Sequence, residues 1–81
     1  MLYQVCKLKF DGFCIYYPKD LRLISASNEE EAIKIYKKNI TVRGRQKVDV
    51  TPVNTQGVIH IDKDKYGYEQ IYIDDKLIKT Y

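Results

Sequence analysis

The segment 25–40, which reads SASNEEEAIKIYKKNI, constrains the fold more than any other part of the chain, because it alone has a clear helical period. Its apolar residues fall on one stripe at roughly 100° per residue. The stripe contains Ala32, Ile33, Tyr36 and Ile40, with Ile35 at its edge. A helix of about three turns is not stable alone in water, so the stripe needs a partner surface from the rest of the chain.

Two overlapping patterns mark the start of this helix. Ser27 followed by Glu30 has the spacing of a capping box, in which each side chain accepts a hydrogen bond from the other residue's amide. Asn28 followed by Glu31 repeats the pattern one residue later. We therefore expect one helix over about residues 28–39.

The residues before the helix alternate as in β-strands. Over residues 3–10, Cys6, Leu8 and Phe10 point to one side. Asp11-Gly12 then favours a two-residue type I′ turn, which needs positive φ at both central positions. The resulting pairs are Phe10 with Phe13, Leu8 with Ile15 and Cys6 with Tyr17. We expect the face shared by these pairs to receive the helix.

The same register bears on the two cysteines. It places Cys6 and Cys14 on opposite faces of the ribbon, where a disulfide cannot form without moving the backbone. We expect two free thiols, as in a reducing compartment, with a disulfide as the alternative.

The rest of the chain also reads mainly as strands. The segment 18–20 is expected to break the second strand, leaving a short one over 21–26. Later strands are expected over 46–51, 58–63, 68–73 and 76–81. Pro52 either ends the first of these or marks it as an edge strand. A turn of two or three residues at Asp74-Asp75 precedes the last. The fold class is α+β: a single domain, 1–81, with a mainly antiparallel sheet of five or six strands, one helix packed on one face, and the order ββ(β)αβββ(β).

Residues for catalysis, metal binding or cofactor binding are sparse. His60 is the only histidine, and the cysteines lack the spacing of paired metal ligands. The segment 62–67 begins like a calcium loop, but Tyr66 and Ile73 occupy positions that need oxygen ligands. We expect no enzyme activity, no metal and no cofactor. The alternative is a weak enzyme that uses Cys14 or His60.

The charges are unevenly distributed, although the net charge is only +3. No acidic residue lies between Glu31 and Asp49, whereas that window holds six basic ones. A basic end is therefore expected, and its candidate partner-binding residues are Lys38, Arg43, Arg45 and Lys47. A solvated surface is the alternative interpretation of these charges.

Tyr68 and Tyr72 are the second set of candidate contacts. If Ile71 and Ile73 face the core, the two tyrosines line the outer face of the sheet. There they would suit a protein interface or stack on the bases of a single strand. Ordinary cross-strand packing is the alternative.

Location and assembly follow from simpler features. No apolar run approaches 18 residues, so we expect no membrane association and a cytoplasmic location. An exposed terminal strand allows a homodimer by edge pairing as well as a monomer.

The phrase ISASNEEEA at 24–32, a strand that runs into an acid-capped helix, resembles small proteins of phages and mobile elements. Small domains rich in Lys, Ile and Tyr are similar to phage-encoded inhibitors of host defence, including anti-CRISPR proteins. The resemblance implies a non-enzymatic binding protein that occupies a surface of a host protein or ribonucleoprotein complex in the host cytosol. Such an inhibitor would use the acidic patch (Asp62, Asp64, Asp74 and Asp75) or block a partner surface. The alternative is a module that binds DNA or RNA through the basic loop 43–47.

Overall fold

The strands of this protein form two antiparallel sheets rather than one. The computed structural model describes residues 1–10, 12, 16–53 and 56–79. Its elements are β1 (Leu2–Phe10), β2 (Tyr16–Ser25), α1 (Glu29–Asn39), β3 (Lys47–Val53), β4 (Ile59–Lys63), β5 (Glu69–Ile73) and β6 (Lys76–Leu77). The first sheet has the order β2-β1-β3 and the second the order β4-β5-β6. The α+β class is confirmed, but the single sheet of five or six strands is wrong.

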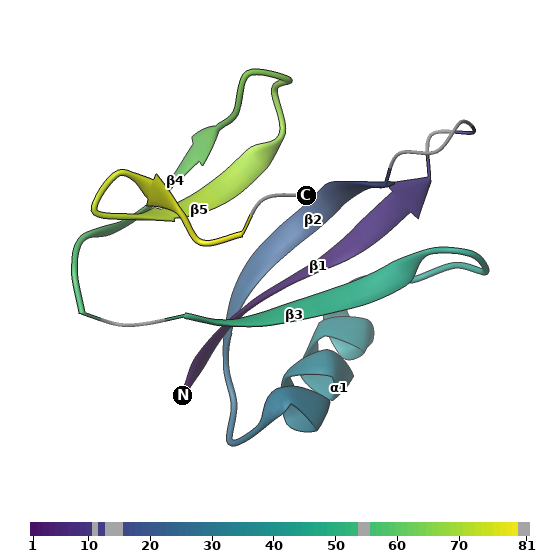
Figure 1. Cartoon of the computed structure of the whole chain (residues 1–81). Coiled ribbons are helices and arrows are strands. Elements are labelled where there is room, and N and C mark those ends of the chain that lie inside the picture. The colour runs from purple at the N-terminus through teal and green to yellow at the C-terminus, as the bar shows by residue number, and fades with distance from the viewer. Residues whose placement is uncertain (11, 13–15, 54–55, 80–81) are drawn as a thin grey trace.

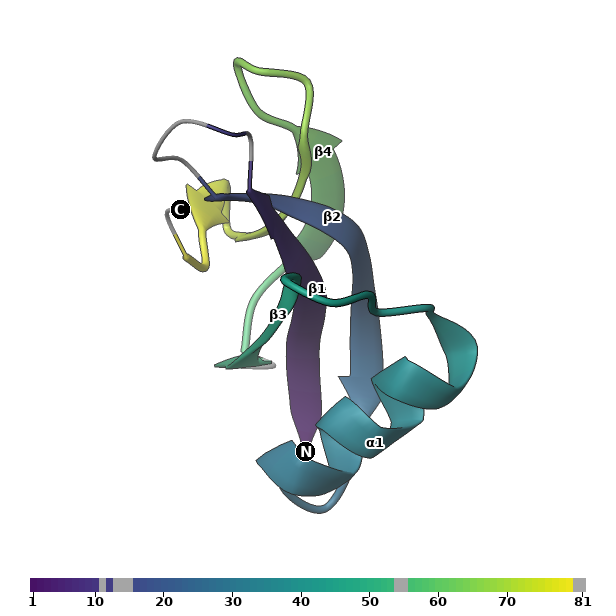
Figure 2. The ribbon, with the colours of Figure 1, turned by 90° about the vertical axis from the view of Figure 1, so that its right-hand side faces the viewer.

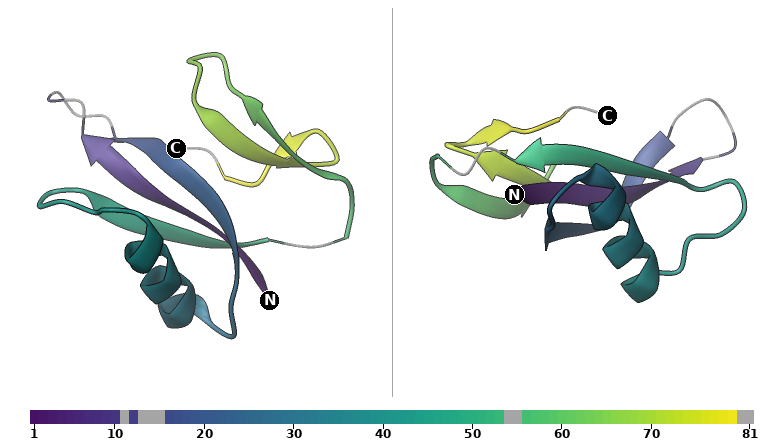
Figure 3. Two further views of the ribbon diagram at one scale, coloured as in Figure 1. Left: turned by 180° about the vertical axis from the view of Figure 1, so that it is seen from behind. Right: turned by 90° about the horizontal axis from the view of Figure 1, so that it is seen from below.

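The three parts are stacked as layers (Figure 1). Helix α1 covers one face of the first sheet, and the second sheet lies on the opposite side. The view from the side and the view from behind show the same order of layers (Figures 2 and 3). The first sheet is therefore the middle layer, and together the layers form one compact domain.

The helix begins where the second capping pattern predicts. Asn28 is the N-cap, and its side-chain oxygen accepts a bond from the Glu31 amide at 2.9 Å. The Glu31 carboxylate in turn accepts bonds from the Ser27 hydroxyl at 2.8 Å and the Ser27 amide at 3.3 Å. The hydroxyl bond is the main cause that lowers the pKa of Glu31, because it stabilises the ionised form. The box of Ser27 with Glu30 is not formed.

Strand β1 is buried on both faces because it is the central strand of the middle layer. Tyr3 and Val5 pack against Ala32 and Tyr36 of the helix. Cys6, on the other face, packs with Leu21 and with Ile71 of the second sheet. The prediction that the face with Cys6 packs against the helix is therefore wrong, because that face packs against the second sheet. Phe10, predicted to lie on that face, is 41% exposed.

The link between β1 and β2 is longer than the sequence suggests. Phe10 pairs with Tyr16, so the expected two-residue turn at Asp11-Gly12 is wrong. Leu8 lies opposite Pro18, not Ile15, and Tyr17 lies opposite Lys9, not Cys6. The predicted partners Phe13 and Ile15 lie outside the described residues, as does Cys14.

Strand β2 continues through 18–20, so the predicted break is wrong. The Ala26 amide donates to the Met1 carbonyl at 3.0 Å, which directs the backbone of Met1 toward β2. Along an antiparallel strand, the backbone N–H and C=O groups of successive residues point alternately to the two neighbouring sides. Those of Leu8 therefore point toward β3, and the backbone nitrogen of Pro18, which lies opposite Leu8, points away from the sheet. A proline there costs no ladder hydrogen bond. The same alternation places Pro52 on the outer side of edge strand β3, as one of the predicted alternatives has it.

Strand β2 bends at a bulge near Asp20. The register with β1 shifts between Val5 and Lys7, and Asp20 has a φ of 52°. The hydroxyl of Tyr36 donates to the Asp20 carbonyl at 2.7 Å, so the helix holds this bulge directly. The Nζ of Lys7 adds an ion pair at 3.0 Å to the Asp20 carboxylate.

The second sheet is a meander. Ile59 pairs with Ile73 and Ile61 with Ile71, while the two-residue turn at Asp74-Asp75 places Ile73 opposite Lys76. Both aspartates have positive φ, 50° and 65°, so the shorter of the two predicted turns is confirmed. The chain after β6 returns to the first sheet, where the Lys79 ammonium contacts the Asp49 carboxylate at 2.9 Å.

Candidate functional site

The four predicted basic contacts lie at one end of the molecule, where α1 ends and β3 begins (Figure 1). Lys38, Arg43, Arg45 and Lys47 are all exposed. A turn presents the two arginines: the Gln46 amide donates to the Arg43 carbonyl at 2.9 Å, and the Gln46 side chain accepts from the Arg43 amide at 3.1 Å. Gly44, with a φ of 39°, allows the chain to reverse between them.

The two predicted tyrosines lie elsewhere. Tyr72 stacks on His60 of the second sheet, with ring centroids 5.3 Å apart. Tyr68 stacks on Tyr17 of β2, with ring centroids 5.0 Å apart, so it lies at the junction of the two sheets. The predicted position of Tyr68 on an outer face is therefore wrong. The structure therefore places the two tyrosines in separate ring pairs, one at the junction of the sheets and one within the second sheet.

Two residues of the predicted acidic patch, Asp64 and Asp74, accept hydrogen bonds within the second sheet and its turns. Asp64 accepts bonds from the amides of Tyr66 and Tyr68 and from the Gln70 side chain. Desolvation acts to raise the pKa of Asp64, but these bonds prevail and lower it. Asp74 accepts from the Val58 amide at 3.0 Å. Both carboxylates thus close turns of the second sheet.

Cys6 and His60 point to different parts of the molecule, and Cys14 lies outside the described residues. Cys6 is a buried free thiol in the cluster that contains Ile71. His60 lies opposite Tyr72, so its side chain points to the other face of the second sheet from Ile71. Within the described ranges, no three His, Cys, Asp or Glu residues form a group able to hold a metal ion.

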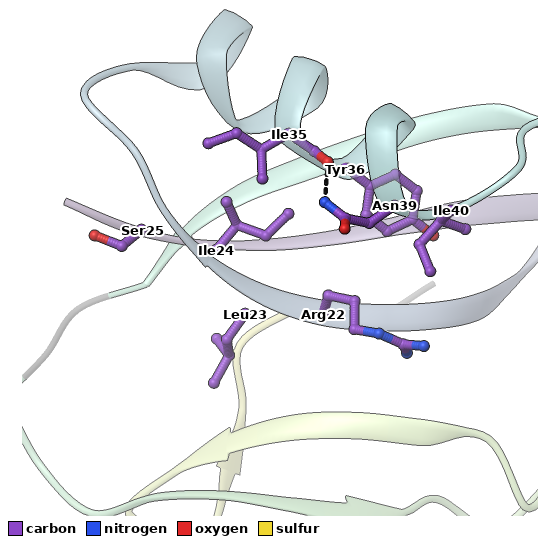
Figure 4. A pocket seen from close by; sticks show the side chains of 8 residues that line it. All are labelled: Arg22, Leu23, Ile24, Ser25, Ile35, Tyr36, Asn39 and Ile40. Atoms are coloured by element: carbon purple, nitrogen blue, oxygen red, sulfur yellow. Dashed lines mark hydrogen bonds between the residues drawn. The ribbon is translucent and has the colours of Figure 1, made fainter.

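An open groove lies between α1 and the neighbouring edge of the first sheet (Figure 4). Its hollow measures about 420 Å³. Helix α1 contributes Ile35, Tyr36, Asn39 and the following Ile40, and β2 contributes residues 22–25. Ile24 points up toward the helix, whereas Leu23 points to the opposite side, toward the second sheet. The groove is thus walled by apolar side chains and bounded by the backbone of β2.

That backbone carries groups that the sheet does not use. Because β2 is an edge strand, its residues that point away from β1 have no ladder partner on that side. The alternation that follows from the Ala26–Met1 bond places Leu23 and Ser25 at these outward positions. Each of the two residues offers an N–H and a C=O along the groove.

Arg22 is the charged residue that lines the groove. Its guanidinium donates to the Leu21 carbonyl at 3.0 Å. Within the part of the chain that the structure describes, no carboxylate forms an ion pair with Arg22. Asp20 is paired with Lys7, and Glu31 is held by Ser27. Glu31 stays charged when Ser27 donates to it, but neither carboxylate lines the groove, where Arg22 is the charged residue.

Tyr36 closes the floor of the groove. Its side chain is buried, and burial together with the charge of Asp20 raises the pKa of Tyr36 to about 12. The hydroxyl is therefore a neutral hydrogen-bond donor, and its bond to the Asp20 carbonyl makes it a structural group.

A second hollow, of about 370 Å³, lies beside the other half of β2. Residues 18–22 line it together with Gly67, Tyr68 and Glu69. Arg22 borders both hollows, so depressions flank β2 along much of its length.

The sequence contains one signal for this groove, the position of Ile35 on the helix. Ile35 was placed at the edge of the helical stripe, and a half-buried edge residue is what a groove beside a helix requires. Arg22 has no distinguishing signal in the sequence, because its alternation within 21–26 is that of an ordinary strand residue. The edge position of β2 follows from the tertiary pairing and has no local signal.

Comparison of the chain with protein-family models, curated proteins and solved structures finds no match. Helix α1, the helix within the described residues, is too short and too polar to cross a membrane.

Proposed function

We propose that this protein is a non-catalytic binding protein that occupies a surface of a larger macromolecule, and that the groove between α1 and β2 is its contact site. The observation that carries the proposal is the combination of an apolar hollow with an unused strand edge and the Arg22 charge. Concave apolar surfaces with a few polar groups are characteristic of binding sites.

The resemblance of 24–32 to small proteins of phages and mobile elements extends this proposal. On that basis the macromolecule is a host protein or ribonucleoprotein complex, and binding inhibits a host defence system, as anti-CRISPR proteins do. The groove supports this role only in general terms, because an inhibitor without enzyme activity acts by covering a surface that its target needs.

A matched pair of helix variants tests the contact site. Ile35 and Ile33 are both half-buried isoleucines of α1, but only Ile35 lines the groove. The variant Ile35→Glu places a carboxylate in the groove, whereas Ile33→Glu places the same group on the other side of the helix. Far-ultraviolet circular dichroism and thermal melting confirm that both variants are folded.

The readout is quantitative capture of proteins and ribonucleoprotein complexes from host lysate on immobilised protein. We expect a protein that wild type and Ile33→Glu retain and that Ile35→Glu loses. Equal retention by the two variants, or capture of nothing by wild type, contradicts the proposal.

Nucleic-acid binding through the basic loop 43–47 is a second candidate function. The turn that exposes Arg43 and Arg45 favours it, because two guanidiniums on one turn suit phosphate groups. Titration of labelled DNA and RNA over a range of salt concentrations tests it. A steep loss of affinity with salt that Arg43→Ala/Arg45→Ala abolishes supports the candidate, and absence of binding at low salt refutes it.

A further inference from the structure

We infer that the outer edge of β2 binds an extended, acidic segment of a partner protein as an added strand of the first sheet. This inference rests on the proposed function, because it specifies what the groove takes. Addition of a strand to an exposed edge is a common form of peptide recognition, in which backbone bonds give affinity and alternate side chains give specificity.

The first argument is the distribution of proline along the sheet edges. On edge strand β3, Pro52 occupies an outward position. On β2, Pro18 occupies an outward position in the first half of the strand. Proline removes the donor that an added strand needs, so both places are protected against pairing. The half of β2 that contains Leu23 and Ser25 carries no such protection, and it is the half that borders the groove.

The second argument is the shape on the two sides of this edge. Side chains of an added strand would alternate between the helix side and the side of the second sheet. On the helix side they meet the hollow lined by Ile24, Ile35 and Ile40. On the other side they meet Leu23, which is 36% exposed and points away from the helix (Figure 4). Apolar contacts are therefore available to both sets of side chains.

The third argument is charge, which also selects among occupants. Arg22 lines the groove, and the other residues that line it carry no charge. The Arg22 guanidinium therefore favours a segment with carboxylates. A second copy of this chain would bring one Arg22 close to another across the paired edges, which disfavours a homodimer through β2.

The test uses two synthetic hexapeptides, acetylated and amidated, with alternating Val-Glu or alternating Val-Lys. Each is titrated into the ¹⁵N-labelled full chain, and backbone amide shifts are followed by NMR. We expect the Val-Glu peptide to bind at least about tenfold more tightly than the Val-Lys peptide, with the largest shifts at Leu23 and Ser25.

Two variants at one position separate backbone from side chain. Leu23→Pro removes the outward N–H, whereas Leu23→Ala keeps it and removes the side chain. Loss of one backbone hydrogen bond weakens Val-Glu binding about tenfold in Leu23→Pro, and we expect a smaller loss in Leu23→Ala. If the proline variant does not fold, the shift map and the peptide comparison on wild type still decide the question.

Several results overturn the inference. These are equal binding of the two peptides, shifts centred away from β2, no binding of either peptide, or equal effects of the two Leu23 variants. A mass in light scattering that doubles with concentration in wild type and not in Leu23→Pro assigns the edge to a second copy and also overturns it. Loss of lysate capture in Ile35→Glu alongside any of these results leaves the groove as a binding site but refutes strand addition.

Discussion

The hydroxyl of Tyr36 should contribute measurably to stability, and the contribution should depend on pH in a defined way. The side chain is 0% exposed, and the hydroxyl donates to the Asp20 carbonyl at 2.7 Å. Tyr36→Phe keeps the ring and leaves that carbonyl without this donor. We expect the free energy of unfolding at pH 7 to fall by about 1–2 kcal/mol, the range for a buried neutral hydrogen bond.

The pH dependence follows from the raised pKa. The pKa of Tyr36 is about 12 in the folded protein against 10.0 for an ordinary tyrosine. Between these values the unfolded chain loses the proton while the folded protein keeps it, so the stabilisation is complete below pH 10 and is lost as pH rises toward 12. At pH 11 the advantage of wild type over Tyr36→Phe should therefore shrink by about 1.4 kcal/mol.

Urea unfolding followed by circular dichroism at pH 7 and pH 11 measures both quantities. Tyr66→Phe is the matched control, because Tyr66 is 70% exposed and its change should leave stability within about 0.5 kcal/mol of wild type. The reasoning fails if Tyr36→Phe is as stable as wild type at pH 7, or if the difference between them is the same at pH 11.

Three further changes test the layers and turns. Asn28→Ala removes the helix cap and should cost about 1 kcal/mol, whereas Asn28→Ser should cost little; thermal melting that does not distinguish them argues against the cap. Ile71→Ala should cost about 2–5 kcal/mol in urea unfolding because Ile71 is 0% exposed, with Ile61→Ala, 51% exposed, as its control on the facing strand. Gly57→Ala should lower the melting temperature more than Gly67→Ala: both have positive φ, but only at Gly57 would a Cβ meet a side-chain oxygen at 2.6 Å.

The helix and most strands could be predicted because their signals are local. The helix and its cap at Asn28 require only neighbouring residues, and the structure confirms both. The same holds for the two-residue turn at Asp74-Asp75. Of the predicted stripe, Ala32, Tyr36 and Ile40 pack in the helical cluster, but the edge residue Ile35 packs there in place of Ile33.

The assignment of faces failed because β1 is apolar on both sides. Alternation of Cys6, Leu8 and Phe10 marks one face, but Tyr3 and Val5 on the other are equally able to pack. A strand that lies between two layers is buried on both faces, and no rule of alternation then says which layer covers which face. The division into two sheets was missed for the same reason.

The groove could not be predicted because it depends on which strand forms an edge. From the sequence, Pro18 predicts a break in the strand, yet its outward position lets β2 continue at the edge of the sheet. The predicted contacts are not among the residues that line the groove. Arg43 and Arg45 form a separate basic turn, and Tyr68 and Tyr72 pack on neighbouring rings.

Amide hydrogen exchange along β2 tests the central claim most directly, because it asks whether this edge is available for binding. In the free protein, the amides of Arg22 and Ile24 point toward β1 and should be protected, while those of Leu23 and Ser25 should exchange about tenfold or more faster. With the partner bound, the Leu23 and Ser25 amides should become protected as well. Equal protection of all four amides in the free protein at low concentration would contradict an available edge, and unchanged exchange at Leu23 and Ser25 in the complex would contradict its use.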